Sequence, residues 1–176
     1  MKNKKGFTLV ELLAVIAILA ILVIIALPNV MGMFNNAKKS TFVTEVQNIY
    51  KQVATDFVSD SLKSTGALSY CQYDSTVTAS FTVSDYPSKQ DNGTYKFSDN
   101  TTCKPLNLTT TKNYYVDVDS NGSIKKLVVY DGSFYFADSD GVAKVTDITD
   151  TTVHKAEEAA TINFKSGSTS APSTQG

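Results

Sequence analysis

A long apolar segment near the N-terminus limits what this chain of 176 residues can fold into. Residues 7–27 are apolar except for Thr8 and Glu11, and a short basic stretch, residues 1–6, precedes them. A helix of these 21 residues is about 31 Å long, which is enough to cross the hydrocarbon core of a bilayer. Glu11 stands out because an ionisable group in hydrocarbon costs several kcal/mol unless it finds a partner. The segment therefore predicts a membrane helix in which Glu11 has a specific role.

Two simpler interpretations of this N-terminus stay open at this point. A secretory signal peptide also begins with a basic stretch, but the apolar run here is long and no Ala-x-Ala cleavage site clearly follows it. A plain transmembrane anchor would hold Lys2, Lys4 and Lys5 on the cytoplasmic side of the membrane.

A second helical pattern follows the apolar segment. Apolar residues recur at gaps of four and three at Phe42, Val46, Ile49, Val53 and Phe57. These gaps place all five on one helix face, and such a face needs a surface to pack on. The simplest surface is the chain's own C-terminal domain. We therefore expect residues 28–65 to continue the helix in amphipathic form, with Gly66 as its stop.

Pro28 lies where the two helical patterns meet. It cannot donate a hydrogen bond to the carbonyl of Ile24, and Gly32 weakens the helix one turn later. A kink is expected at Pro28 and Gly32. The alternative is a boundary between two separate helices at the membrane surface.

The pattern after residue 66 changes to short alternating segments and turn residues. Asn121-Gly122 between two alternating runs is a strong signal for a β-hairpin. We expect a meander of about four antiparallel strands, one face of which covers the apolar helix stripe. The expected strands are Tyr114–Asp119, Leu127–Tyr130, Phe134–Ala137 and Val142–Val145.

Three further predictions concern the rest of this domain. A short helix is expected from a cap at Asp150 to Ala160, and residues 166–176 are expected to form a flexible tail because they are rich in Ser, Thr, Gly and Pro. Cys71 and Cys103 could form one disulfide in an exported domain, or both could remain free thiols.

The composition argues against several classes of function. All the basic residues apart from His154 are lysines, so the bidentate arginine that reads phosphate and guanine is absent and nucleic-acid binding is not expected. His154 is the only histidine, and no catalytic arrangement can be built around it. Asp117-x-Asp119-x-Asn121-Gly122 resembles half of a calcium loop, but Val128 stands where the bidentate Glu should be. We expect no enzyme activity, no cofactor and no metal.

The stretch Lys5-Gly6-Phe7-Thr8-Leu9-Val10-Glu11-Leu12-Leu13 resembles the processing site of type IV prepilins. The resemblance is close from residue 4 to about residue 34. It implies that a membrane peptidase cleaves after Gly6 and N-methylates Phe7. It also matches Glu11 to a glutamate that is conserved in that family, and Pro28 to the proline that interrupts the family's helix.

The resemblance implies an α+β fold like that of type IV pilins, with a long N-terminal helix packed against an antiparallel β-sheet meander. The expected parts are a leader (1–6), a transmembrane and filament-core helix (7–27), its amphipathic continuation (28–65), a β-sheet head (66–165) and the tail (166–176). The expected function is that of a structural subunit of a type IV pilus, which serves adhesion, surface motility or biofilm formation. The subunit would wait in the cytoplasmic membrane and then reach the cell surface in the pilus.

The expected partners are other copies of the chain in a helical filament, the prepilin peptidase, the assembly machinery in the membrane, and a surface or host receptor. Cleavage would create an α-ammonium at Phe7, which Glu11 of a neighbouring copy could pair with to set the axial register. One alternative is a minor pilin or a pseudopilin of a secretion or DNA-uptake system. Many minor members lack the glutamate that Glu11 matches. Another alternative is a monomeric membrane-anchored binding domain.

Overall fold

The computed structural model describes residues 8–63, 66, 68–139, 142 and 144–172, except for the side chain of Asn29. The chain divides into two compact units, residues 1–38 and residues 39–176, which we describe separately. Helix α1 (Leu9–Ser61) contributes its first part to unit 1 and its second part to unit 2, which we call the head.

Unit 1 consists of the apolar part of α1. The helix begins at Leu9 and includes both Pro28 and Gly32. Each described side chain from Thr8 to Lys38 is exposed, although most of these residues are apolar. Within the described residues, none of the apolar side chains in the first part of α1 is therefore buried.

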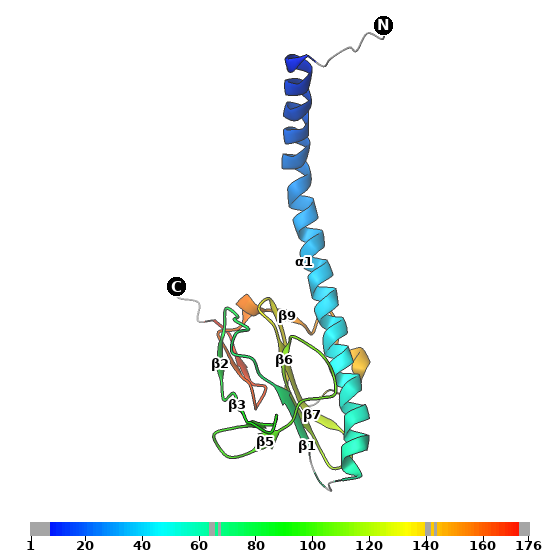
Figure 1. Cartoon of the computed structure of the whole chain (residues 1–176), viewed down its shortest axis with the longest axis vertical. Coiled ribbons are helices and arrows are strands. Elements are labelled where there is room, and N and C mark those ends of the chain that lie inside the picture. The colour runs from blue at the N-terminus through cyan, green and yellow to red at the C-terminus, as the bar shows by residue number, and fades with distance from the viewer. Residues whose placement is uncertain (1–7, 64–65, 67, 140–141, 143, 173–176) are drawn as a thin grey trace. The chain divides into compact units, whose positions relative to one another are not determined.

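In the head, the second part of α1 packs on a β-sheet through the expected apolar stripe. Phe42, Val46, Ile49 and Val53 are each at most 1% exposed, and Phe57 is half-buried against the same cluster. Figure 1 shows this part of the helix running along one face of the sheet. The predicted arrangement of a long helix on an antiparallel sheet is confirmed.

The central sheet of the head has five antiparallel strands in the order β1-β6-β7-β8-β9. Their bounds are β1 (Leu68–Gln72), β6 (Asn113–Val118), β7 (Ile124–Tyr130), β8 (Phe134–Asp138) and β9 (His154–Lys155). The predicted hairpin joins β6 to β7 through Gly122, whose φ of 85° is a conformation that glycine adopts readily. Val118 pairs with Ile124 beside the turn, the register shifts by one residue between Asp117 and Val118, and Tyr115 then faces Val128.

Side chains of the central sheet alternate between two buried faces. In β6, Tyr114, Val116 and Val118 belong to the cluster beneath α1, whereas Tyr115 belongs to a second cluster on the other face. Both faces are covered, so apolar residues stand on both sides of the strands and the alternation of apolar and polar residues is only partial. The sheet is thus the middle layer of the head.

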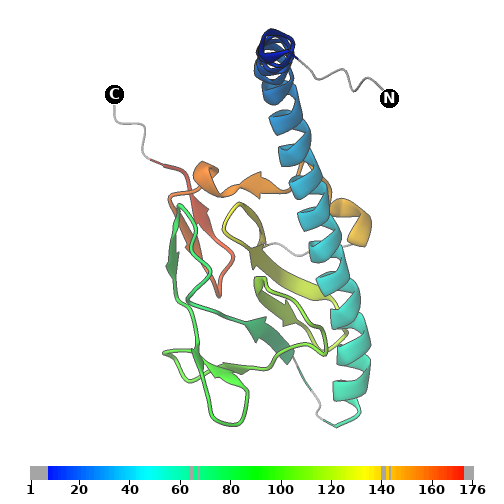
Figure 2. The same cartoon turned by 45° about the horizontal axis from the view of Figure 1, so that its top comes forward.

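Two small sheets form the layer opposite α1 (Figure 2). One has the order β11-β10-β2 and the other β3-β4-β5. Their strands are β2 (Thr82–Ser84), β3 (Ser88–Lys89), β4 (Tyr95–Lys96), β5 (Thr102–Cys103), β10 (Thr161–Asn163) and β11 (Thr169–Ser170). The pairing of β10 with β2 is parallel. The second cluster beneath these sheets is strongly aromatic, and Phe164 lies at its centre with no exposed surface.

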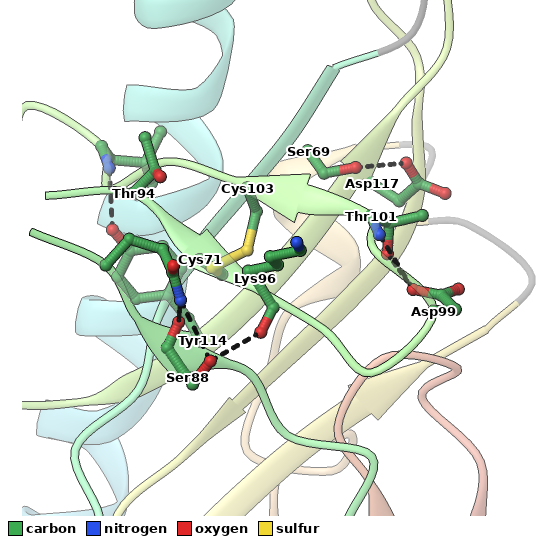
Figure 3. Close-up of a disulfide and its surroundings, with 12 residues drawn as sticks. Ser69, Cys71, Ser88, Thr94, Lys96, Asp99, Thr101, Cys103, Tyr114 and Asp117 are labelled. Atoms are coloured by element: carbon green, nitrogen blue, oxygen red, sulfur yellow. Dashed lines mark hydrogen bonds between the residues drawn. A yellow bond between two sulfur atoms is a disulfide. The ribbon is translucent and has the colours of Figure 1, made fainter. Parts of the chain in front are cut away.

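A disulfide joins Cys71 in β1 to Cys103 in β5, with the two Cα atoms 5.6 Å apart (Figure 3). Both cysteines are buried in the second cluster. The bond ties the β3-β4-β5 sheet to the edge of the central sheet, where the amide of Cys71 also donates to the carbonyl of Lys104.

The structure corrects the fourth strand that was expected at Val142–Val145. Val145–Asp147 forms a short 3-10 helix, η1, and the edge of β8 is occupied by β9 instead. Ala143 lies outside the described residues. Alternation alone could not show that His154 and Lys155, further along the chain, would pair with this edge.

The expected helix from Asp150 to Ala160 is also wrong. This stretch contains β9 and then a single 3-10 turn, η2 (Ala156–Glu158). The β-branched run Thr151-Thr152-Val153 has low helix propensity and precedes the edge strand directly.

The tail expected at residues 166–176 is ordered in its first part. Gly167, with a φ of 74°, turns the chain back so that β11 pairs with β10. The Gly167 amide donates to the Asn163 carbonyl over 3.0 Å and closes this turn. Residues 173–176 lie outside the described part of the chain.

Candidate functional site at the N-terminus of helix α1

The first turn of α1 is closed by two side chains, Thr8 and Glu11. Thr8 precedes the first helical residue, which makes it the N-cap, and Glu11 lies three positions later. The Glu11 carboxylate oxygen Oε2 accepts the Thr8 amide over 2.9 Å and the Thr8 hydroxyl over 2.8 Å. In return, the Glu11 amide donates to the Thr8 hydroxyl oxygen over 3.3 Å. This is a capping box, which satisfies amides that a helix start leaves without partners.

The two oxygens of the Glu11 carboxylate have different partners. Both bonds from Thr8 go to Oε2, and no group among the described residues donates to Oε1. The carboxylate is exposed on the surface of unit 1. Glu11 can therefore fix the start of its own helix and still accept a positive group from outside.

Sequence reasoning identified Glu11 but missed the role of Thr8. The signal was present, because a Ser or Thr followed three residues later by Glu before an apolar run is the pattern of a capping box. Gly6 and Phe7, the residues expected at the cleavage site, lie outside the described residues. Their proposed roles rest on the sequence.

The rest of the candidate site is the apolar surface that follows Glu11. Its large apolar side chains up to Phe34 are each at least 42% exposed. Within the described residues, α1 is the one helix that is long and apolar enough to cross a membrane. An exposed apolar surface this extensive requires a nonaqueous environment or other protein copies to cover it.

Comparison with protein-family models identifies what kind of N-terminal segment this is. Residues 1–27 match the prokaryotic N-terminal methylation motif. The chain carries the leader signature of type IV prepilins. The resemblance seen in the sequence is confirmed, and the signature implies processing by a prepilin peptidase and assembly into pili. Comparison with curated proteins found no match, and neither did comparison with solved structures.

The motif covers residues 1–27 only and assigns nothing to the head. His154 stacks on the ring of Tyr135, and its Nδ1 atom lies 3.2 Å from a Glu158 carboxylate oxygen. No group of three or more His, Cys, Asp or Glu residues that could hold a metal occurs in the described part of the chain. The signature suggests a structural subunit.

The stretch that resembles half of a calcium loop is explained by hairpin structure. Asp119 Oδ1 accepts the amides of Asn121 and Ser123, each over 2.9 Å, and Lys125 Nζ lies 3.2 Å from Asp119 Oδ2. Asp117 instead accepts the hydroxyl of Ser69 from the neighbouring strand (Figure 3). Asp117 and Asp119 thus accept hydrogen bonds from different donors within the protein.

Proposed function

We propose that this prepilin is the major, repeating subunit of a type IV pilus. The methylation motif at residues 1–27 carries the proposal. The extensive exposed apolar surface of unit 1 supports it, because that surface suits both a bilayer before assembly and helix–helix packing in a filament. The head then forms the part of each subunit that meets the surroundings.

Maturation begins with cleavage between Gly6 and Phe7, which removes the basic leader 1–6. The prepilin peptidase then methylates the new amino group of Phe7. Residues 7–27 hold the subunit in the cytoplasmic membrane until the assembly machinery adds it to the filament. Residues 28–65 continue this core helix into the head, and Pro28 with Gly32 supplies a point at which the helix can bend.

Glu11 sets the axial register between subunits. Its Oε2 atom closes the first turn of its own helix, and Oε1 accepts the Phe7 ammonium of a neighbouring copy. An unpaired carboxylate and an unpaired ammonium are each costly among packed apolar helices, so a stack in which they meet is favoured over one shifted along the axis. The pair specifies register, while apolar packing provides the adhesion.

The finished filament serves adhesion, surface motility or biofilm formation through contacts of the head with a surface or a host receptor. The chain itself needs no cofactor for this role. Glu11 favours a repeating subunit over a minor pilin or pseudopilin, and the number of copies per filament distinguishes them. A monomeric membrane-anchored binding domain would need neither Glu11 nor cleavage at Gly6.

Three variants separate the charge of Glu11 from its capping role. Glu11→Gln keeps an oxygen that can accept the Thr8 amide but removes the charge, and Glu11→Ala removes both. Thr8→Val keeps the charge and removes the hydroxyl of the box. We expect filaments sheared from cells to be lost or strongly reduced for both Glu11 variants and retained for Thr8→Val, with equal amounts of each protein in the membrane.

Normal filaments from Glu11→Gln would contradict the pairing of Glu11 with an ammonium. Sheared surface material that contains no filaments of this chain, even for the original sequence, would support the monomeric anchor instead. Immunoblots of the membrane fraction provide the control for expression and insertion.

A further inference from the structure

The head contains two Asn-Gly dipeptides in surface turns, Asn92-Gly93 and Asn121-Gly122. Both asparagines are exposed, and each dipeptide is followed by a hydroxyl residue, Thr94 or Ser123. An asparagine before glycine can lose its amide when the glycine nitrogen attacks the side-chain carbonyl, because glycine has no side chain to hinder the ring that forms. From sequence alone, the two dipeptides are expected to react equally readily.

The backbones of the two turns are also alike. The Gly93 amide donates to the Gln90 carbonyl over 3.0 Å, and the Gly122 amide donates to the Asp119 carbonyl over 3.0 Å. Both glycines have positive φ, 81° and 85°. The attacking nitrogen is therefore held in the same way at both sites, and any difference in reactivity comes from the side chains.

The side-chain carbonyl of Asn92 is polarised by two donors. Its Oδ1 accepts the Thr94 amide over 3.0 Å and the Thr94 hydroxyl over 2.7 Å. Donors aimed at a carbonyl oxygen stabilise the negative charge that develops there when a nucleophile adds to the carbon. No described atom would lie within 4 Å of a Cβ at Gly93, so the Gly93 side of the turn is open.

At Asn121, the amide two residues later donates to a different acceptor. The Ser123 amide donates to Asp119 Oδ1 over 2.9 Å, and no group among the described residues donates to the Asn121 side-chain oxygen. The ring of Phe57 also covers Gly122, where an added Cβ would lie 3.1 Å from the Cε1 atom. Asn121 thus has neither the polarised carbonyl nor the open space of Asn92.

We propose that Asn92 is the site at which the folded head deamidates spontaneously, ahead of Asn121. The Gly93 nitrogen gives up its proton and bonds to the Asn92 side-chain carbon, and the amide nitrogen leaves as ammonia. Water then opens the resulting succinimide at either carbonyl to give aspartate or isoaspartate. The product adds one negative charge next to Asp91 on the exposed β3–β4 turn.

The test compares the two sites within one preparation of the full chain. The chain is aged in detergent in 18O-labelled water, and the same chain is aged after reduction and unfolding in denaturant. Trypsin separates the sites because Asn92 lies between Lys89 and Lys96 and Asn121 between Lys112 and Lys125. Mass spectrometry then gives the labelled fraction at each site.

We expect similar rates at the two sites in the unfolded chain and a rate at Asn92 roughly fivefold or more above that at Asn121 in the folded chain, the factor that one net hydrogen bond supplies. A folded chain whose ratio equals that of the unfolded chain, or in which Asn121 reacts first, would overturn the proposal.

Two substitutions isolate the hydroxyl. Thr94→Ser keeps the donor to Asn92 Oδ1, and Thr94→Val removes it while keeping the branched shape. We expect Thr94→Val to slow labelling at Asn92 about fivefold in the folded chain, and Thr94→Ser to leave it near the original rate. Equal rates for both variants would exclude the hydroxyl as the cause. This outcome is independent of whether the chain forms pili.

Discussion

A single carboxylate, Asp60, ties the end of α1 to the two segments joined by the disulfide. Its Oδ2 atom accepts the Tyr70 hydroxyl over 2.9 Å and lies 2.5 Å from Lys104 Nζ. Tyr70 and Lys104 are the chain neighbours of Cys71 and Cys103. Burial alone would raise the pKa of Asp60, but its bonds to Lys104 and Tyr70 outweigh this and lower the pKa below its ordinary value.

This lowered pKa predicts how the head responds to acid. The unfolded chain takes up a proton at Asp60 more readily than the folded chain, so the bonds of Asp60 stabilise the fold above the ordinary pKa of 3.8 and that contribution is lost as the pH falls through the lower folded value. We expect Asp60→Asn to reduce the free energy of unfolding by about 1–2 kcal/mol at neutral pH. The deficit relative to the original chain should shrink below about pH 4.

Urea unfolding of the full chain in detergent, followed by circular dichroism over this pH range, measures the effect. Asp150→Asn, at an exposed turn, provides the matched control and should change little at any pH. A deficit of Asp60→Asn that stays constant into acid would show that the carboxylate charge is not what holds these segments together.

Single residues were predictable where a local pattern carried the information. Glu11 could be identified because a carboxylate in an apolar run is exceptional, and Thr8 could have been identified from the capping pattern. Asp60 could not, because its partners Tyr70 and Lys104 are brought to it only by strand pairing.

At the scale of elements, the second part of α1 stabilises the head through its apolar stripe. Ile49 has no exposed surface and lies in the cluster beneath the helix, whereas its neighbour Asn48 is exposed. Two side-chain bonds add to this packing, from Gln47 to the Ile148 carbonyl and from Tyr50 to the Val142 carbonyl. The apolar stripe of α1 therefore contributes more to the stability of the head than the polar face of the same helix.

We expect Ile49→Ala to reduce the free energy of unfolding of the head by about 2–5 kcal/mol, because it leaves a cavity between the helix and the sheet. Asn48→Ala, one position away on the exposed face, should change it by no more than about 0.5 kcal/mol. Denaturant unfolding monitored through the tyrosines of the sheet measures both. Equal effects of the two variants would mean that the helix does not stabilise the head through this stripe.

The elements that sequence predicted are those held by contacts close in the chain. The amphipathic continuation of α1 follows from its spacing, and the β6–β7 hairpin follows from Asn121-Gly122 between apolar runs. Local patterns could not predict the edge strand β9, the 3-10 turn η2 or the parallel pairing of β10 with β2, because these features depend on segments that are distant in the chain. The Ser-rich composition likewise led to the prediction of a flexible tail where β11 forms, because the pairing of β11 depends on the turn at Gly167.

For the whole molecule, the two units have opposite relations to solvent. The head buries apolar side chains on both faces of its central sheet, whereas unit 1 leaves its apolar side chains exposed. Unit 1 also carries the prepilin signature. These facts together support a subunit whose N-terminal helix is covered first by lipid and then by other copies of the chain.

The most direct test of this account is the mass of the N-terminal peptide of the chain in filaments sheared from the cell surface. We predict a peptide that begins at Phe7 and carries one methyl group on its amino nitrogen. Filament material in which the chain keeps residues 1–6, or begins elsewhere than Phe7, would contradict the account.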